Sequence, residues 1–303
     1  MIATLTDPAL LATVLRVMTP LLLAGLGVLI SDRAGVLNIG MEGIMLCGAL
    51  TAVLGSAWTG NPFAGLAAAL ACGTVLGALM AFAINGLGTQ FIITGIALNL
   101  AATSGTALAL FLATGDQGMS GALDSGVLPS LIVPALGPYV SGHHMLTWAA
   151  LLAVPLVAVL LARTPFGLRL RAVGADPGAA RITGVNVARV QMRALMLSGF
   201  FGGAAGAYLS LGYVSWFAQG MTAGRGFIAL AAAIMGMGSA FGTLAAALVL
   251  GAAETVAITL QSVGLPSEVM QMIPYLVPVV VLTAYSARRM ARANRKTRKG
   301  PHR

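Results

Sequence analysis

Charged side chains are scarce in this sequence of 303 residues: 17 are Lys or Arg, 8 are Asp or Glu, and together they make up 8% of the chain. A soluble domain carries about 25% charged residues. Apolar residues account for 58% and the mean hydropathy is +0.93, whereas a water-soluble fold exposes a large share of its surface to solvent. The composition therefore excludes a soluble enzyme, a nucleic-acid-binding protein and a secreted disulfide scaffold, and it indicates a chain surrounded by lipid.

Cysteine and histidine are also rare. Cys47 and Cys72 both lie inside apolar runs, where we expect small core side chains rather than disulfides or metal ligands. His143 and His144 are adjacent, so their side chains should point apart, and no third ligand is spaced to join them. The sequence therefore predicts no metal site.

Lysine occurs only within the C-terminal stretch 288–303. The chain therefore lacks a G-x-x-x-x-G-K-[ST] loop, which holds nucleotide phosphates through backbone N–H groups and a lysine. No constellation of catalytic side chains is present either. We expect a chain that is not an enzyme and binds no cofactor itself.

Long apolar runs dominate what is present, and about 20 apolar residues suffice to span a bilayer as a helix. The clearest runs are 36–56, 64–84, 91–113, 145–162, 194–217, 241–260 and 270–286. Two stretches are less regular: 9–30 contains Arg16 and Pro20, and 227–238 is only about half a span long. We predict an all-α polytopic membrane protein with about nine transmembrane helices, in a range of seven to ten. Residues 1–287 should form one transmembrane domain, and 288–303 a disordered basic tail.

The basic residues predict the orientation. The loop 163–193 holds six arginines against the single acid Asp176, and the tail 288–303 is basic with no acid. The loop 114–144 contains no Lys or Arg. Because basic loops remain in the cytoplasm, we expect 163–193 and the C-terminus to be cytoplasmic and 114–144 to face outside.

These assignments agree with one another only if 227–238 crosses the membrane as its own short segment. The N-terminus is then external if 9–30 spans. Alternatively, residues 7–18 lie flat at the interface, where Arg16 can extend toward water.

Glycine interrupts two of the apolar stretches, 35–43 and 220–242. Broken helices in each half of a membrane protein often build transport sites, because unwound backbone offers polar groups at depth. For most glycines, close helix packing is the alternative explanation. Four pairs fit the small-xxx-small pattern of helix contact: Gly73/Gly77, Gly199/Gly203, Gly202/Gly206 and Gly238/Gly242.

Four Asn or Glu side chains fall within the apolar runs: Asn38, Glu42, Asn99 and Glu254. Such groups are costly in lipid and usually face the bundle interior or an aqueous path. We predict that Asn38, Glu42 and Asn99 line a pathway for a small hydrophilic solute. The alternatives are structural: Asn99 hydrogen-bonds a neighbouring helix, Glu42 lies near the interface, and Glu254 pairs across helices.

The loop 163–193 contains signals for a short helix. Asp176 followed by Pro177 is typical of a helix N-cap and first residue, and Gly184 is typical of a helix end. A helix of about two turns, flanked by arginines, can seat in the groove of a partner. The alternative is an ordinary basic loop that only sets topology.

Several stretches resemble a known family. Residues 32–46, Asp-Arg-Ala-Gly-Val-Leu-Asn-Ile-Gly-Met-Glu-Gly-Ile-Met-Leu, closely resemble the signature of the smaller permease subunit of bacterial nucleoside and simple-sugar ABC importers. Residues 95–100, 171–184 and 226–231 resemble further motifs of that family. The wider group includes ribose-type and branched-chain amino-acid permeases. The latter usually lack the Glu-Gly pair at 42–43, which favours nucleoside or sugar cargo.

The resemblance implies a multi-pass permease domain in the bacterial cytoplasmic (inner) membrane that forms half of a translocation pathway. It implies a larger homologous permease as partner, cytoplasmic ATP-binding-cassette ATPases that use ATP and Mg, and an extracytoplasmic solute-binding protein. The surrounding bilayer is a further partner, and nucleic acid is not. It also implies a coupling segment that contacts the ATPase, with the residues Gly174, Asp176, Pro177, Ala179, Ala180, Arg181 and Gly184.

Other functions remain open at this point. An ion-gradient-driven transporter could use Glu42 and Glu254 as proton carriers. An ABC permease for branched-chain amino acids is a second alternative. An integral-membrane transferase needs clustered acids or histidines at one membrane face, which the sequence lacks, and a scaffold without a pathway does not explain the two broken segments.

Overall fold

The computed structural model describes residues 8–116, 118–121, 123, 126, 128–131, 142–261, 276–277 and 283. Within them, seven helices are long and apolar enough to cross a membrane, which confirms the all-α polytopic class and falls in the predicted range. They are α2 (Pro8–Asp32), α3 (Met41–Thr59), α4 (Pro62–Gly86), α5 (Phe91–Thr114), α6 (Met145–Arg163), α9 (Val187–Leu209) and α11 (Ala240–Gln261). Most of the predicted run 270–286, and all of the tail 288–303, lie outside the described residues.

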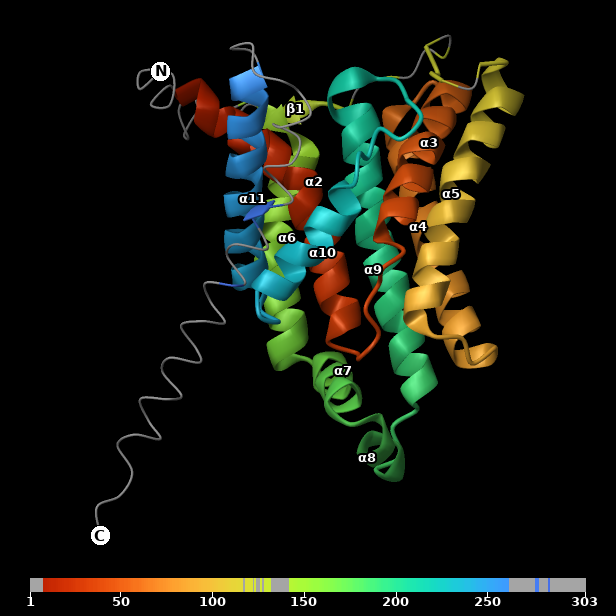
Figure 1. The fold of residues 1–303 in the computed structure, drawn as a ribbon, viewed down its shortest axis with the longest axis vertical. Helices are drawn as coiled ribbons and strands as arrows, with labels where there is room; N and C mark the ends of the chain where they lie inside the picture. Colours follow the sequence, from red (N-terminus) through yellow and green to blue (C-terminus); the bar gives the residue numbers. More distant parts are fainter. Residues whose placement is uncertain are drawn as a thin grey trace.

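Shorter elements complete the described fold. They are α7 (Pro165–Ala175), α8 (Pro177–Ile182), α10 (Arg225–Met235), the π-helical turn η2 (Ser210–Val214) and the two-residue strands β1 (Ser130–Leu131) and β2 (His143–His144). The sequence predicted α8 and α10, but it did not predict α7 or the β1–β2 pair. Figure 1 shows α7 and α8 together at the lower end of the bundle, with α8 projecting farthest.

Two helices begin inside the bundle rather than at its ends (Figure 1). After α2 reaches the lower end, residues 33–40 turn back upward, and α3 starts well above that end. After η2, near the upper end, the chain descends again before α10 starts, and α10 then continues to the lower end. The predicted short segment 227–238 overlaps α10, an apolar helix of 11 residues, and both predicted glycine-rich breaks are present.

Glycine permits both breaks. Gly35 follows α2 with φ +75°, and Gly224 precedes α10 with φ +77°. Side chains other than glycine rarely adopt such values. The chain can therefore leave one helix and start another within a few residues.

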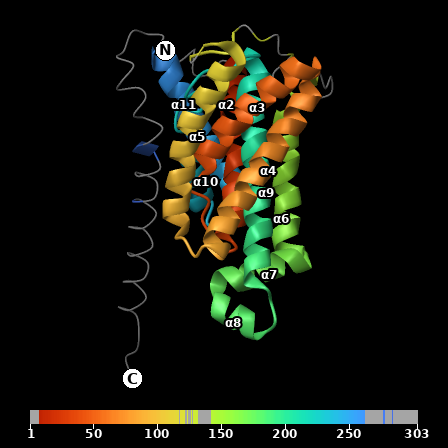
Figure 2. The same ribbon diagram turned by 90° about the vertical axis from the view of Figure 1, so that its right-hand side faces the viewer.

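Helices α2 and α9 form the centre of the bundle, while α5 lies at its edge (Figures 1 and 2). In their apolar spans 78% of α2 and 72% of α9 is buried, against only 17% of α5. Leu21, Leu22 and Leu26 of α2 are fully buried. The surface of α5 is therefore available to lipid or to a partner, whereas α2 and α9 are surrounded by other helices of the chain.

Contacts between α9 and its neighbours depend on glycine. A Cβ atom added to Gly199 would lie 2.0 Å from the carbonyl oxygen of Gly73 in α4, and one added to Gly203 would lie 2.2 Å from that of Ala69. A Cβ on Gly206 would lie 2.1 Å from the carbonyl oxygen of Met45 in α3. The predicted packing role of these glycines is confirmed, because the backbones touch directly.

The predicted pair Gly238/Gly242 has a different setting. Gly238 has φ +73° in the turn between α10 and α11. A Cβ on Gly242 would lie 2.3 Å from the carbonyl oxygen of Gly236. This pair therefore forms a tight turn rather than a contact between two separate helices.

The two adjacent histidines lie at the upper end. Leu131 pairs with His143 and Ser130 with His144, and both histidines are buried. The Nδ1 atom of His144 accepts a hydrogen bond from the Leu146 N–H at 3.2 Å and so caps α6. Burial lowers the pKa of His144 to about 4, so the ring stays neutral at ordinary pH. Among the described residues, no group of three His, Cys, Asp or Glu could hold a metal ion.

Candidate functional site

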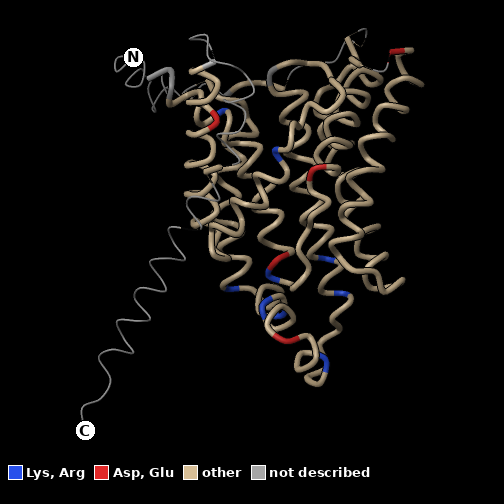
Figure 3. Tube along the Cα trace, viewed as in Figure 1, with Lys and Arg blue, Asp and Glu red and all other residues tan. Residues whose placement is uncertain are grey.

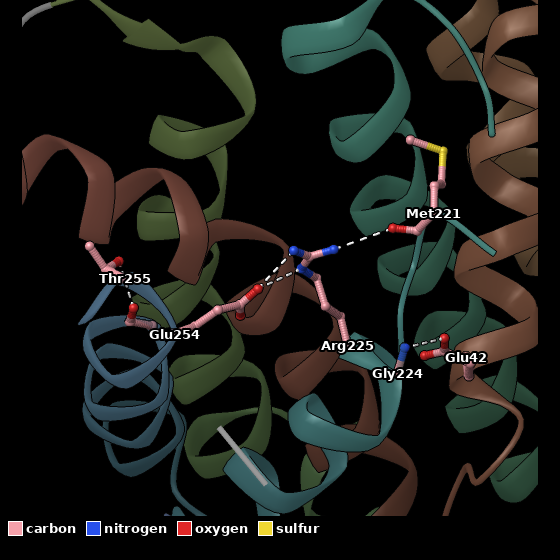
Figure 4. Close-up of polar contacts among 7 residues, drawn as sticks. Glu42, Met221, Gly224, Arg225, Glu254 and Thr255 are labelled. Carbon is pink, nitrogen blue, oxygen red and sulfur yellow. Dashed lines mark hydrogen bonds and ion pairs between the residues drawn. The ribbon is translucent and has the colours of Figure 1, made fainter. Parts of the chain in front are cut away.

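Glu42 joins the two helices that begin inside the bundle. It lies in the first turn of α3, and its carboxylate reaches across to the start of α10 (Figure 4). Oε1 accepts the Gly224 N–H at 2.8 Å, and Oε2 accepts the Gly226 N–H at 2.6 Å. The first N–H groups of a helix lack partners within it and carry the positive end of its dipole. The Glu42 carboxylate therefore caps a helix other than its own.

This contact requires close backbone approach. A Cβ on Gly226 would lie 2.6 Å from the Glu42 Cα, so any larger residue at 226 would push α10 away from α3. Glu42 is half-buried among the contacts of this site. Glu42 is the second residue of α3, and α3 starts inside the bundle rather than at its end (Figure 1), so the structure gives no support to the alternative that Glu42 sits near the interface.

Asn99 supports the start of α3 from α5. Its Oδ1 accepts the Gly43 N–H at 2.8 Å, and its Nδ2 donates to the Ile39 carbonyl at 3.0 Å. One amide thus satisfies a free donor of the helix and a carbonyl of the broken segment before it. The predicted alternative, in which Asn99 hydrogen-bonds a neighbouring helix, describes the contact with Gly43 of α3.

Asn38 is fully buried below these groups. Its Nδ2 donates to Ser198 Oγ of α9 at 2.9 Å, and its backbone N–H donates to Ser31 Oγ at 3.3 Å. Among the described residues, Asn38 Oδ1 has no hydrogen-bond partner. Asn38 therefore ties the broken segment to α2 and α9.

Arg225, the first residue of α10, is a site residue that sequence reasoning missed. Its Nε and Nη2 donate to Glu254 Oε1 of α11 at 3.1 and 2.7 Å, and its Nη1 donates to the Met221 carbonyl at 3.3 Å (Figure 4). The side chains are 25% and 11% exposed. The predicted pairing of Glu254 across helices is confirmed. A signal existed, because Arg225 is the only basic residue between Arg193 and Arg288.

We call Glu42, Asn99, Gly224, Arg225 and Glu254 the polar junction. It brings together α3, α5, α10 and α11 well inside the bundle. Of the predicted pathway residues, it contains Glu42 and Asn99, while Asn38 lies beneath it. Uncoiled backbone, two helix N-termini and a charged pair at depth are the features from which membrane proteins build solute sites.

The Arg225–Glu254 pair should stabilise the start of α10. Arg225→Ala leaves the Glu254 carboxylate without its partner, and Glu254 Oε2 already has none among the described residues. We expect a loss of about 3 kcal/mol in unfolding free energy, the usual cost of breaking a buried pair. Arg225→Met combined with Glu254→Leu should recover most of it. Thermal unfolding in detergent of the wild type, Arg225→Met, Glu254→Leu and the double variant measures the coupling, and strictly additive effects would contradict a direct pair.

The predicted coupling segment lies at the lower end, far from the polar junction (Figures 1 and 3). Asp176 caps α8 as predicted: its Oδ1 accepts the N–H groups of Gly178 and Ala179 at 2.8 and 3.0 Å. Gly184 ends the segment with φ +83°. Ala180 is buried, and Gly174, Asp176, Pro177, Ala179, Arg181 and Gly184 are exposed.

Gly174 connects this segment to the broken stretch before α3. A Cβ on Gly174 would lie 2.4 Å from the Arg33 carbonyl oxygen. The Arg33 Nε donates to the Gly238 carbonyl at 2.9 Å, and Arg33 Nη2 donates to the same oxygen. The contacts therefore run without a gap from α7 through Arg33 to the turn after α10.

Comparison with known proteins assigns the fold to a family. Residues 10–282 match the family described as branched-chain amino acid transport system / permease component. The chain belongs to this family. It is therefore a multi-pass permease component of a transport system, as the resemblance of its motifs implied.

Curated relatives of this permease extend over most of its length. It is 37% identical over 268 residues to the putative glucose ABC transporter permease protein TsgC13 of Haloferax volcanii, with 84% of this chain and 79% of the relative covered. It is 33% identical over 286 residues to the guanosine ABC transporter permease protein NupQ of Bacillus subtilis, with 89% of each chain covered. It is 31% identical over 296 residues to the nucleoside ABC transporter permease protein NupC of Lactococcus lactis, with 93% of each covered. No solved structure matches.

Proposed function

We propose that this permease forms half of the translocation pathway of an ATP-driven importer for nucleosides or simple sugars. Relatives named for guanosine, nucleosides and glucose match nearly the whole chain, which supports this cargo over the amino acids in the family description. The sequence contains no phosphate-binding loop, so ATP and Mg are used by separate ATPase subunits. A larger homologous permease completes the pathway, and an extracytoplasmic binding protein delivers the solute.

The polar junction is the observation that carries this proposal. Glu42 and Arg225 are partly exposed within the bundle. Thr103 and Ser104, about one turn beyond Asn99 on α5, are also exposed. Polar groups at this depth suit a hydrophilic solute better than lipid. Glu42 and Asn99 border the pathway, and Asn38 holds the segment that bears them.

The coupling segment receives the force. With the lower end in the cytoplasm of a bacterium and the chain in its inner membrane, the exposed residues of α8 contact the ATPase. Gly174 transmits their movement to Arg33, and Arg33 transmits it to the end of α10 through Gly238. The start of α10 is held by Glu42, so movement at the lower end changes the polar junction.

Gly174→Arg tests this route. The new side chain has no room against the Arg33 carbonyl, so α7 must shift. We expect uptake per ATP hydrolysed to fall about tenfold or more, within the usual range of coupling energies. Deletion of 176–180 should have the same effect. The ratio is measured in membrane vesicles, and Gly105→Ala, at a position with open space around it, should leave it unchanged.

The function itself is tested by affinity purification of the tagged chain from native membranes. An ATPase and a second permease should copurify in near-equal amounts, and uptake should be competed by nucleosides or glucose. Recovery of the chain alone, with uptake abolished by an uncoupler at constant ATP, would establish a gradient-driven transporter instead. Competition by leucine alone would establish amino-acid cargo.

A further inference from the structure

A cavity of about 410 Å³ lies at the lower end between α7 and α9. Phe166 and Arg169 of α7 line one side, and Arg189, Val190 and Arg193 of α9 line the other. Asn186 closes it at the start of α9. We call this space the arginine cavity.

Its charge is uncompensated within the part of the chain that the structure describes. Arg169, Arg189 and Arg193 are exposed, and no acid lines the cavity. The ion pair among the described residues, Arg225–Glu254, lies in the polar junction and not at this cavity. Asp176, the acid in this loop, caps α8. Three guanidinium groups around one space repel one another, so they favour an anion there. Arginine binds phosphate oxygens in pairs of hydrogen bonds.

The start of α9 adds to this attraction. The Asn186 side chain accepts the Arg189 N–H at 3.0 Å and fixes the helix N-terminus beside the cavity. A helix of 23 residues carries a partial positive charge at this end. Arg189 and Arg193 are one turn apart and line the same cavity. Basic residues that only set the membrane topology need to lie in the loop, but they need not surround a cavity as these three arginines do.

The level of the cavity indicates which anion is available. The apolar span that begins with α9 and continues into η2, Val187–Gly212, has 26 residues, or about 39 Å of helix, against a hydrocarbon core of about 30 Å. Its first turns therefore reach the headgroup region. The end of α6 at Arg163 lies directly before α7, and Figure 1 shows α8 projecting farther out than the start of α9. The ring of Phe166 and the methyl groups of Val190, which also line the cavity, suit the start of the acyl chains of a lipid.

We propose that the arginine cavity binds the phosphate group of an anionic phospholipid from the leaflet at that end of the bundle. Basic pockets beside transmembrane helices recognise such headgroups. Arg169, Arg189 and Arg193 hold the phosphate oxygens, and the lipid links α7 to α9. A bound lipid would then hold α7 and the adjoining α8 in a fixed position relative to α9. This assignment is independent of the cargo, whereas Gly184, which ends the coupling segment, also lines the cavity, so the test must separate a lipid from a contact with the ATPase.

Retention of phosphatidylglycerol tests the proposal. The intact chain is purified from nanodiscs of phosphatidylcholine and phosphatidylglycerol, and bound lipids are counted by native mass spectrometry. Wild-type protein should retain phosphatidylglycerol in preference to phosphatidylcholine. Arg189→Gln/Arg193→Gln should weaken retention about tenfold or more, because charge-assisted hydrogen bonds are lost. The control Arg163→Gln/Arg171→Gln removes the same amount of positive charge outside the cavity and should retain phosphatidylglycerol as the wild type does.

Other outcomes overturn the proposal. Equal loss in both double variants would mean diffuse attraction to an anionic surface. Displacement by millimolar inorganic phosphate, without lipid retention, would make this a site for free phosphate. Loss of the copurifying ATPase with lipid retention unchanged would make it a protein contact. If the double variant aggregates, Arg189→Lys keeps the charge but loses paired hydrogen bonds, and unchanged lipid retention there would argue against a phosphate site.

Discussion

Glu42→Ala should reduce uptake at least about tenfold while the protein still assembles. The substitution removes acceptors for two N–H groups at the start of α10, and each charge-assisted hydrogen bond contributes about 1.5–3 kcal/mol. Even one lost bond of this kind shifts a two-state equilibrium about tenfold. The helix α10 then loses its attachment to α3 while its other end remains held by Arg33. Uptake by cells or vesicles, normalised to the amount of folded protein, measures the effect.

Glu42→Gln is the matched control for this variant. Glutamine keeps one carbonyl oxygen that can accept from Gly224 or Gly226, so we expect an intermediate loss. If Glu42 instead carries protons, Glu42→Gln should be as inactive as Glu42→Ala. Wild-type uptake by Glu42→Ala would remove Glu42 from the pathway altogether.

Gly199→Ala should destabilise the whole bundle by about 3 kcal/mol or more, at the upper end of the range for overpacking. The added methyl would lie 2.0 Å from the Gly73 carbonyl oxygen, and backbone on both sides prevents easy relaxation. Glycine-to-alanine changes in a helix otherwise favour the helix by about 1 kcal/mol. Monodispersity and thermal unfolding in detergent reveal the loss.

Gly105→Ala makes the same change on α5, where nothing lies within 4 Å of the added atom. It should be neutral or mildly stabilising. Equal stability of Gly199→Ala and Gly105→Ala would mean that α4 and α9 do not touch as closely as the structure shows.

Local patterns in the sequence predicted the membrane helices and the breaks, because hydropathy and glycine act over one helix length. They also predicted α8, since Asp176 and Pro177 are neighbours of the groups they cap. They did not predict α7, whose mix of Gly, Leu and Arg lacks a long apolar run. Thr164, which accepts the Gly167 N–H, is its start signal.

The contacts of the polar junction could not be predicted from local sequence patterns. Glu42 and Gly226 are 184 residues apart, and Asn38 and Ser198 are 160 apart. No periodicity relates such positions, so a polar residue in an apolar run indicates a special role without naming its partner. Arg225 was missed for this reason, although its isolation among apolar residues marked it.

The partial charges of the polar junction have a consequence for what can pass beside it. The carboxylates of Glu42 and Glu254 are offset by the Arg225 guanidinium and by the N-termini of α3 and α10, each equivalent to about half a positive charge. These positive and negative charges nearly cancel, so the junction offers little net electrostatic attraction to an ion that has lost its hydration water. A neutral ring bearing hydroxyl groups can exchange hydrogen bonds with such a lining, whereas a phosphorylated form of the same molecule finds no counter-charge to replace its hydration. Under the proposed pathway, we expect the junction to select against charged solutes even where it does not distinguish one uncharged polar molecule from another.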